Sequence, residues 1–546
     1  MGLLDWFRRH PEQEETLPGL PWDQHPSIYE QLRSHPPTSK NGLAEDVGDL
    51  PDEERVNAGS QIRWAAGARD GVAVYHMGTG QSRDQAVALL DLVRAYGHTP
   101  TVANKLQVHE FVVQNGAISL IDPFTEALAQ TADVNHHRLY DLARSFATES
   151  PDREPVKFGI AMLGLFRRPE DKEVLHLLGC HDEFTLFSAV AIANGEADTE
   201  GDLWELAKNV RGWGRIHVVQ RLSDTDNPRI KDWLLREGYK NGVMYEYSAY
   251  ICAVAGGLLA ALQREEVDGN LLESAGEIIR ALLAGGPAQN VDDYEEGAAA
   301  IEYYLGHLAE KASALSGFLT VVAIRSFLND QEADWENRTS RGWSIERRDR
   351  LGETCRSITQ YPQWHELALA GMASMDEQVF FQANQAGAEL GIDAWPYHWK
   401  RLRESPRDQG RWYHVMHACN NDRIADVVAF ARQSLPLDQI ATGPADELGL
   451  GIGYEAHNCL GFILQNLGRF PGYGDALVRA GLQSPVVSNR NGALKTLETW
   501  GRANWPADLE RLLAQALTDE PDEKVRQSMQ KVIDGVPLDE GNAQAT

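Results

Sequence analysis

The sequence predicts an all-α protein, an α-solenoid of antiparallel helix pairs that can divide into two blocks. An apolar helical phrase recurs in residues 158–166, 187–194, 216–222 and 247–253, and turn-forming residues separate its copies. Taking Ala161, Ala189, His217 and Ala249 as equivalent positions gives steps of 28, 28 and 32 residues. A period of this length is typical of stacked helix pairs, in which each pair buries its apolar face against its neighbours.

Composition and charge agree with a folded protein and disfavour two classes of ligand. Hydrophobic residues make up 43% of the 546 residues, and 14 residues are tryptophan, which is ample for a folded core. The net charge of −29 disfavours binding to nucleic-acid backbones and to anionic lipid. No stretch approaches the roughly 20 apolar residues that a transmembrane helix needs, so no transmembrane segment is predicted.

The cysteines indicate the redox state of the protein. They are odd in number, far apart and mostly within apolar helical stretches, a pattern that disfavours a disulfide framework. We therefore expect reduced, buried thiols in a cytoplasmic protein. The five cysteines are Cys180, Cys252, Cys355, Cys419 and Cys459.

The many prolines and charged residues of the segment 1–55 predict an irregular tail with one short helix near 27–34. Residues 1–9 place an apolar run before two arginines, which is not the order of a secretory signal. They suit either a small amphipathic anchor for a partner or an end that docks on the protein's own first helix. After the tail, the spacing predicts a helix over 56–68 and another over 82–96, with Ser82 as N-cap and Gly97 as its stop.

Residues 100–128 allow two interpretations. Asn115 and Gly116 form either the turn of a β-hairpin or the end of one helix before the next. The helical character of the rest of the chain favours helix ends.

Gly78 and Gly80, just before the predicted helix at 82, resemble a phosphate-binding glycine loop. Arg83 stands where a dinucleotide-binding fingerprint has its third glycine, so we expect a turn between helices instead.

The helical pattern falls into two blocks. The first covers residues 56–330, and its turns lie at 168–171, 194–198, 224–228 and 240–242. Residues 331–350 are predicted to form a basic, tryptophan-containing loop or boundary. The second block covers residues 351–535. Residues 536–546 predict a frayed acidic tail.

Near the C-terminus the period returns, with Cys459, Ala493 and Ser528 at steps of 34 and 35 residues. Residues 519–533 combine an acidic turn, a Val-Arg pair and an apolar helix, and residues 484–497 are a looser copy. This arrangement resembles a HEAT repeat. The resemblance implies HEAT-like antiparallel helix pairs.

The densest group of polar and aromatic residues lies in the third and fourth copies of the phrase. On adjacent repeats these side chains would line one concave face, which is the usual binding surface of a helical-repeat protein. The alternative is that the rings form the core between repeats while the charges cap helices. The predicted binding residues are Trp213, Arg215, His217, Arg221, Glu246 and Tyr250.

Two basic clusters, at 338–350 and 400–411, interrupt the acidic chain. Trp343 lies within the first, and Trp399 and Trp412 flank the second, a mixture of residues enriched at protein interfaces. Their interleaved acidic residues favour a solvated, salt-bridged surface instead. The residues assigned to this secondary basic surface are Arg341, Trp343, Arg347, Arg401 and Arg403.

His414 and His417 lie three residues apart and would share one helix face, where they could hold a metal. The further ligands would have to come from elsewhere, so we expect ordinary helix histidines and no metal site. No serine–histidine–aspartate context, nucleophile elbow or paired metal cysteines is found, so we predict no catalytic residue.

Residues 213–217, 230–238 and 246–249 resemble a group of bacterial proteins labelled limonene hydroxylase. The resemblance implies an NADH-dependent monoterpene monooxygenase and supplies no catalytic positions. Two hypotheses follow. The favoured one is a non-enzymatic α-solenoid scaffold without a cofactor that binds a protein or peptide; the alternative is the hydroxylase, which would use NADH or a flavin.

Overall fold

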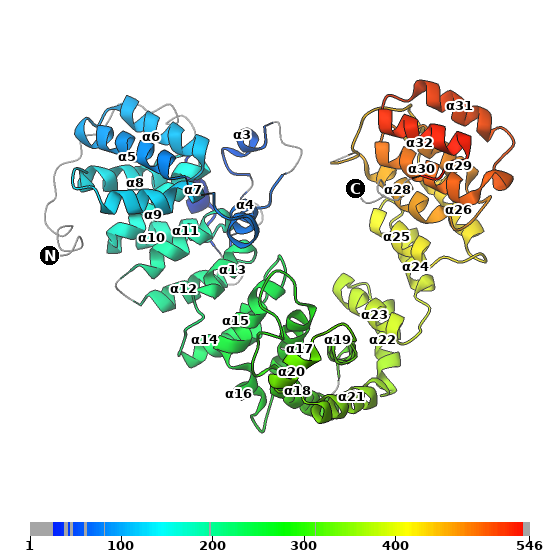
Figure 1. Cartoon of the computed structure of the whole chain (residues 1–546), viewed down its shortest axis with the longest axis horizontal. Coiled ribbons are helices and arrows are strands. Elements are labelled where there is room, and N and C mark those ends of the chain that lie inside the picture. The colour runs from blue at the N-terminus through cyan, green and yellow to red at the C-terminus, as the bar shows by residue number, and fades with distance from the viewer. Residues whose placement is uncertain are drawn as a thin grey trace. The chain divides into compact units, whose positions relative to one another are not determined.

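The computed structural model describes residues 26–37, 42–43, 47, 49–58, 63–80, 82–195, 198–311, 313–451 and 453–538 (Figure 1). Within these ranges 70% of the residues lie in helices and none in a strand, which confirms the all-α prediction. The chain divides into two compact units, Met1–Tyr361 and Pro362–Thr546. No helix of the described ranges has the length and apolar character needed to span a bilayer.

The first unit is a succession of helices joined by short turns. It begins with α2 (Ile28–Ser34), α3 (Glu53–Asn57), α4 (Ala68–Val72), the π-helical turn η2 (Ala73–Met77), α5 (Arg83–His98), α6 (Val102–Asn115), α7 (Ala117–Ala129) and α8 (His136–Glu149). It continues with α9 (Arg153–Phe166), the 3-10 turn η3 (Pro169–Asp171), α10 (Lys172–Gly179), α11 (Asp182–Ala193), α12 (Thr199–Lys208), α13 (Trp213–Gln220), α14 (Pro228–Trp233) and the π-helical turn η4 (Leu234–Gly238). It ends with α15 (Glu246–Gly256), α16 (Leu258–Leu262), α17 (Gly269–Ala284), α18 (Gly297–Lys311), α19 (Leu315–Leu328), α20 (Trp335–Ser340) and α21 (Ile345–Thr359).

The four copies of the apolar phrase lie on alternate helices of this unit, α9, α11, α13 and α15. Each of these helices packs against the next one, and the row continues through α17, α19 and α21. Of the positions that define the period, Ala189, His217 and Ala249 are buried and Ala161 is half-buried. The recurring phrase therefore forms the contact surface between successive helices of the row.

Local sequence explains where several of these helices begin and end. Side chains of Ser82, Asp198 and Asn227 accept hydrogen bonds from the otherwise unpaired amides of α5, α12 and α14. Gly116 separates α6 from α7 with a φ of +75°, a conformation that glycine adopts without strain. The helix-end interpretation of Asn115 and Gly116 is thus confirmed.

Two predicted helix bounds were wrong. Residues 56–68 do not form one helix, because α3 ends at Asn57, residues 63–67 are not helical and α4 begins only at Ala68. Gly97 does not stop its helix, since α5 continues to His98. A β-carbon at Gly97 would come within 3.3 Å of the β-carbon of Asn135, so the glycine serves close packing rather than a turn.

Residues 331–350 contain helical structure where a loop or boundary was expected. They hold α20 and the first part of α21, each capped by an acidic or hydroxyl side chain, Asp334 and Ser344 respectively. Trp343 between the two helices is buried, and its ring centroid lies 4.9 Å from that of Phe327. This segment therefore packs onto α19, and the division between the units falls later, after Tyr361.

Most of the predicted tails, residues 1–25 and 539–546, lie outside the described residues. The short helix expected near 27–34 is confirmed as α2, with the Ser27 hydroxyl accepting from the backbone amide of Glu30. Its buried residues Ile28 and Leu32 face the unit, because α2 packs against α8 and α10. Part of the region predicted as an irregular tail is therefore attached to the first unit.

The second unit has its own row of alternate helices. Within it α25, α28, α30 and α32 pack one against the next. Its helices are α22 (Gln363–Ala373), α23 (Glu377–Glu389), α24 (Trp395–Glu404), α25 (Gln409–His417), α26 (Ile424–Ser434), α27 (Leu437–Ile440), α28 (Glu455–Leu467), α29 (Asp475–Leu482), α30 (Val487–Trp500), the 3-10 turn η5 (Arg502–Asn504), α31 (Leu509–Asp519) and α32 (Glu523–Asp534).

An arginine near the start of α30 and one near the start of α32 make matching hydrogen bonds. Arg490 donates to the carbonyls of Ser484 and Pro485, six and five residues earlier, at 2.8 and 2.9 Å. Arg526 donates to the carbonyls six and five residues before it, at 2.6 and 3.5 Å. The two segments compared with HEAT repeats share this local structure.

Candidate functional site

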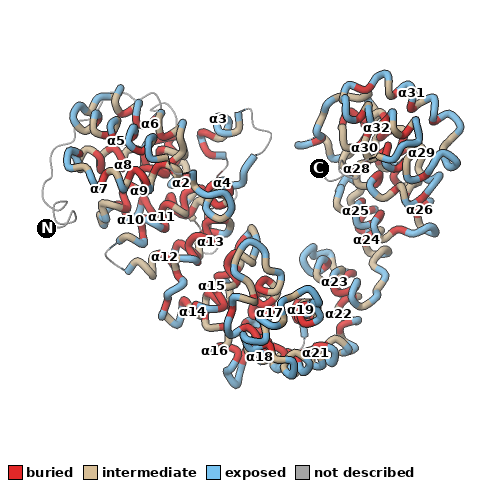
Figure 2. The backbone as a smooth tube through the Cα atoms, viewed as in Figure 1, coloured by how far each residue is buried: buried red, intermediate tan, exposed pale blue. Residues whose placement is uncertain are grey.

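The predicted binding residues occupy α13, its C-terminal end and α15, and half of them are buried. Trp213, Arg215 and His217 are exposed by only 7, 8 and 2%, and Figure 2 shows α13 buried along most of its length. Arg221 and residues 246 and 250 are half-buried. The structure therefore does not present this group as an open face, and its role in binding stays a prediction.

Residues 63–77, called the covering segment from here on, lie over the aromatic part of this group. The Tyr75 ring stacks on the His217 ring at 5.7 Å between centroids and also contacts the rings of Trp213 and Tyr247, at 6.0 and 5.4 Å. The neighbouring His76 makes a 2.5 Å hydrogen bond between its Nε2 and the Tyr247 hydroxyl. An aromatic cluster thus joins η2 to α13 and α15.

A buried charge cluster lies beneath the same segment. Lys157 of α9 is 1% exposed, and its Nζ lies 2.7 Å from both Asp70 and Glu183 and 3.0 Å from Glu154. Burial alone would lower the pKa of Lys157, but the three carboxylates raise it well above its ordinary value. Burial acts to raise the pKa of Glu183, yet Lys157 and Arg153 lower it to about 2. The ion pairs therefore hold the covering segment to α9 and α11.

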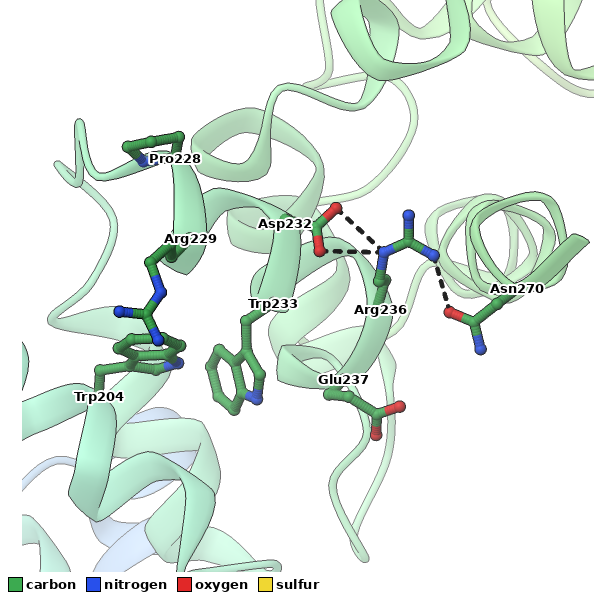
Figure 3. A pocket seen from close by; sticks show the side chains of 8 residues that line it. All are labelled: Trp204, Pro228, Arg229, Asp232, Trp233, Arg236, Glu237 and Asn270. Carbon is green, nitrogen blue, oxygen red and sulfur yellow. Dashed lines mark hydrogen bonds and ion pairs between the residues drawn. The ribbon is translucent and has the colours of Figure 1, made fainter. Parts of the chain in front are cut away.

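The candidate binding site is an open hollow of about 490 Å³ on the side of α12, α14 and η4 (Figure 3). Its volume is in the range of ligand-binding pockets in proteins. The indole rings of Trp204 and Trp233 form its apolar walls, and Arg229 extends over the Trp204 ring. The remaining lining residues are Pro228, Asp232, Arg236, Glu237 and Asn270.

Arg215, a residue predicted from the sequence, supports this hollow. Its Nε donates to the carbonyl of Val210 at 2.8 Å and its terminal nitrogen donates to the carbonyl of Glu237 at 3.0 Å. The guanidinium carbon lies 5.2 Å from the centre of the Trp233 ring. Burial lowers the pKa of Arg215 to about 10, so the side chain stays charged at neutral pH. Arg215 thus positions Trp233 and η4 without reaching solvent itself.

The cations around the hollow differ in whether they are neutralised. Arg236 pairs with Asp232 and Asp268 at 3.0 and 2.7 Å, and Figure 3 shows it also bonded to Asn270. Arg229 is exposed, and no carboxylate among the described residues pairs with it; its guanidinium carbon lies 5.2 Å from the centre of the Trp204 ring.

The Nε1 of the Trp204 ring is buried and has no acceptor in the described part of the chain, so it is not offered to a ligand in the hollow. The hollow therefore offers two aromatic surfaces and one unpaired positive charge.

Both π-helical turns of the described ranges occur at the places just described. The turn η2 carries Tyr75 and His76 of the covering segment, and η4 carries Arg236 and Glu237 of the hollow. A π-helical turn inserts one extra residue in a helix and is frequent at functional sites, because it redirects side chains.

The residues of the secondary basic surface are divided between the two units, and three of the arginines have acidic or carbonyl partners. Arg347 pairs with Glu302 at 3.1 Å, Arg401 pairs with Glu377 at 2.5 Å, and Arg341 donates to the carbonyl of Asp292. Trp343 is buried and Arg403 is exposed. These contacts agree with the salt-bridged alternative.

The two histidines of the α25 pair each stack on another aromatic ring. His414 stacks on His398 at 4.9 Å, and His417 stacks on Tyr413 at 5.8 Å. Burial lowers the pKa of His414. No group of three or more potential metal ligands occurs within the ranges that the structure describes.

Sequence reasoning missed Trp204, Arg229 and the covering segment. Trp204 of α12 and Arg229 of α14 lie 25 residues apart, and only the tertiary structure brings the two side chains together. The covering segment carries a local signal, the sequence Asp-Gly-Val-Ala-Val-Tyr-His over 70–76, which has too little helical periodicity for a core helix. No family model matches this chain, and neither does any curated protein or solved structure.

Proposed function

We propose that this chain is a HEAT-like α-solenoid scaffold of antiparallel helix pairs that binds a protein or peptide partner and catalyses no reaction. The alternate helices that pack in order within each unit support the repeat architecture, as do the matching hydrogen bonds of Arg490 and Arg526. The five thiols are buried and unpaired, which supports a reducing, cytoplasmic location.

The hollow lined by Trp204 and Trp233 is the observation that carries the binding proposal. Tryptophan and arginine are enriched among the few residues that carry most of the binding energy of protein interfaces. The two indoles would take an apolar side chain of the partner, and Arg229 would pair with a carboxylate. A peptide segment with adjacent apolar and acidic residues fits this set of groups.

The test is a capture experiment with matched variants of the full chain. Wild-type protein, a Trp204→Ala/Trp233→Ala variant and a Phe381→Ala control are each used to isolate partners from extracts of the native cell. Phe381 is 57% exposed and belongs to α23 of the second unit, so its removal tests unspecific adhesion through an exposed aromatic ring. We expect one set of proteins that wild type and control retain and that the double variant loses.

The partner is then purified and its affinity measured by calorimetry. Each tryptophan substitution should weaken binding about 30-fold, the equivalent of about 2 kcal/mol for an interface hot spot. Arg229→Ala should weaken binding as well and make it less dependent on salt, since an ion pair is lost. Equal capture by all three proteins would remove the hollow from consideration.

The hydroxylase alternative has its own test on the same protein. Bound flavin, haem or iron would be detected in the visible absorption spectrum and by metal analysis, and turnover would be detected as limonene-dependent consumption of NADH. Such turnover would overturn the scaffold proposal.

A further inference from the structure

The covering segment is held to the first unit as a ligand is held to a binding surface. Its contacts come from side chains that reach four successive helices of the row: Lys157 on α9, Glu183 on α11, Trp213 on α13 and Tyr247 on α15. The covering segment carries no copy of the recurring apolar phrase, and its helical part, residues 68–77, consists of the two short turns α4 and η2. The row therefore presents a surface that accepts a short segment across it.

The complementarity is specific at three positions of the segment. The Asp70 carboxylate reaches the buried Lys157, and the Tyr75 hydroxyl donates to Gln220 at 2.9 Å. Gly71 lies so close to the Trp213 ring that a β-carbon would stand 2.2 Å from it. A carboxylate, a glycine directly after it and an aromatic residue four positions further on are thus recognised together.

The fit is incomplete in one place. His217 is 2% exposed and its Nε2 has no hydrogen-bond partner among the residues described, although buried polar groups of a protein core are usually paired. Gly78 and Gly80 follow the segment with positive φ angles, and no atom lies within 4 Å of where their β-carbons would be. The segment thus covers an unsatisfied polar group and is followed by two uncrowded glycines.

We propose that the face of α9, α11, α13 and α15 is a recognition groove for a short helical peptide, and that residues 68–77 occupy it as an intramolecular ligand. A partner segment with the pattern carboxylate, glycine and, four residues later, an aromatic ring displaces the covering segment. This groove is separate from the hollow of Trp204 and Trp233, so its test does not depend on the proposed function. The covering segment acts as an autoinhibitory contact, because tethering gives it a high effective concentration at the groove.

The experiment uses the full chain and a fluorescent peptide of residues 63–80. Gly71→Leu places a side chain against the Trp213 ring and should unseat the covering segment, whereas Met77→Ala alters a residue that is 79% exposed and should leave it seated. We expect the peptide to bind the Gly71→Leu chain at least about tenfold more tightly than wild type or Met77→Ala, because the groove is vacant only in the Gly71→Leu chain. A peptide that itself carries Gly71→Leu should not bind, and Trp204→Ala/Trp233→Ala should leave peptide binding unchanged.

A second measurement on wild type stands even where the variant does not fold. In native-state hydrogen exchange, amides of residues 68–77 should exchange at least about tenfold faster than those of α9 and α11, because a displaceable segment opens locally. Exchange of 68–77 at the rate of α9 and α11 would show that the segment leaves only on global unfolding and would overturn the proposal. So would a folded Gly71→Leu chain that fails to bind the wild-type peptide.

Discussion

Replacement of Glu520 by glutamine should destabilise the second unit strongly, because it breaks a fully buried ion pair. Both side chains of the Arg490–Glu520 pair are 0% exposed, and two N–H···O contacts of 2.8 Å join them. Glutamine keeps the volume but leaves the Arg490 charge without a counterion in the interior. Loss of one partner of a buried pair costs about 3–5 kcal/mol, even though the intact pair need not be stabilising relative to apolar residues.

The assay is urea-induced unfolding of the full chain, with hydrogen exchange in α30 and α32 reporting on the second unit. A loss of this size should lower the unfolding midpoint of that unit by about 1–2 M, for an ordinary dependence on urea. Glu523→Gln is the matched control: it removes the exposed partner of Arg526 and should shift the midpoint by less than about 0.4 M. Arg490→Met combined with Glu520→Leu should recover most of the loss. A Glu520→Gln shift no larger than that of the control would refute the reasoning.

Three further predictions concern charge and burial. Burial, with the charge of Arg221, lowers the pKa of His217 to about 3, so only the unfolded chain binds a proton at this residue as the pH falls below 6.5. The first unit should therefore lose about 2 kcal/mol of stability between pH 6.5 and 5. Urea unfolding of His217→Gln should show a weaker dependence of stability on pH. Lys157→Met should destabilise the first unit by about 3 kcal/mol, because it leaves a buried carboxylate cluster uncompensated, whereas Lys172→Met, at a 55% exposed side chain, should cost less than about 1 kcal/mol by the same measurement. Burial raises the pKa of Cys355 to about 12 and the pKa of each of the other four thiols above its ordinary value. All five thiols should therefore resist a thiol-specific chromogenic reagent at pH 8 until urea unfolds the chain. Rapid labelling of the native protein would contradict this prediction.

Several helices of the first unit could be predicted because their signals are local. The apolar phrase, the N-cap at Ser82 and the glycine at 116 each act within a few residues of their own position. The same reasoning failed over 56–68, where Gly67 instead packs closely against the backbone of Asp182, and at Gly97, which serves packing against Asn135.

The exposure of the predicted binding residues could not be derived in this way. Arginine is a residue type enriched at interfaces, yet in the fold Arg215 is buried against Trp233 and donates a hydrogen bond to the carbonyl of Glu237. His217 is covered by Tyr75, which lies 142 positions earlier in the chain. A sequence pattern within one or two helices carries no information about contacts between residues that lie so far apart in the chain.

The sequence alone determined that this protein is all-α, because helical periodicity and capping are properties of neighbouring residues. Only the tertiary structure decided which polar and aromatic side chains are accessible. The hydrogen bond from the Gly67 amide to Glu183 spans 116 residues and holds the covering segment over one group of aromatic residues. Another pair, Trp204 and Trp233, is half-buried and lines the hollow. The burial of a side chain depends on which distant segments pack against it. For this reason the helices could be predicted from the sequence, whereas the accessibility of the binding residues could not.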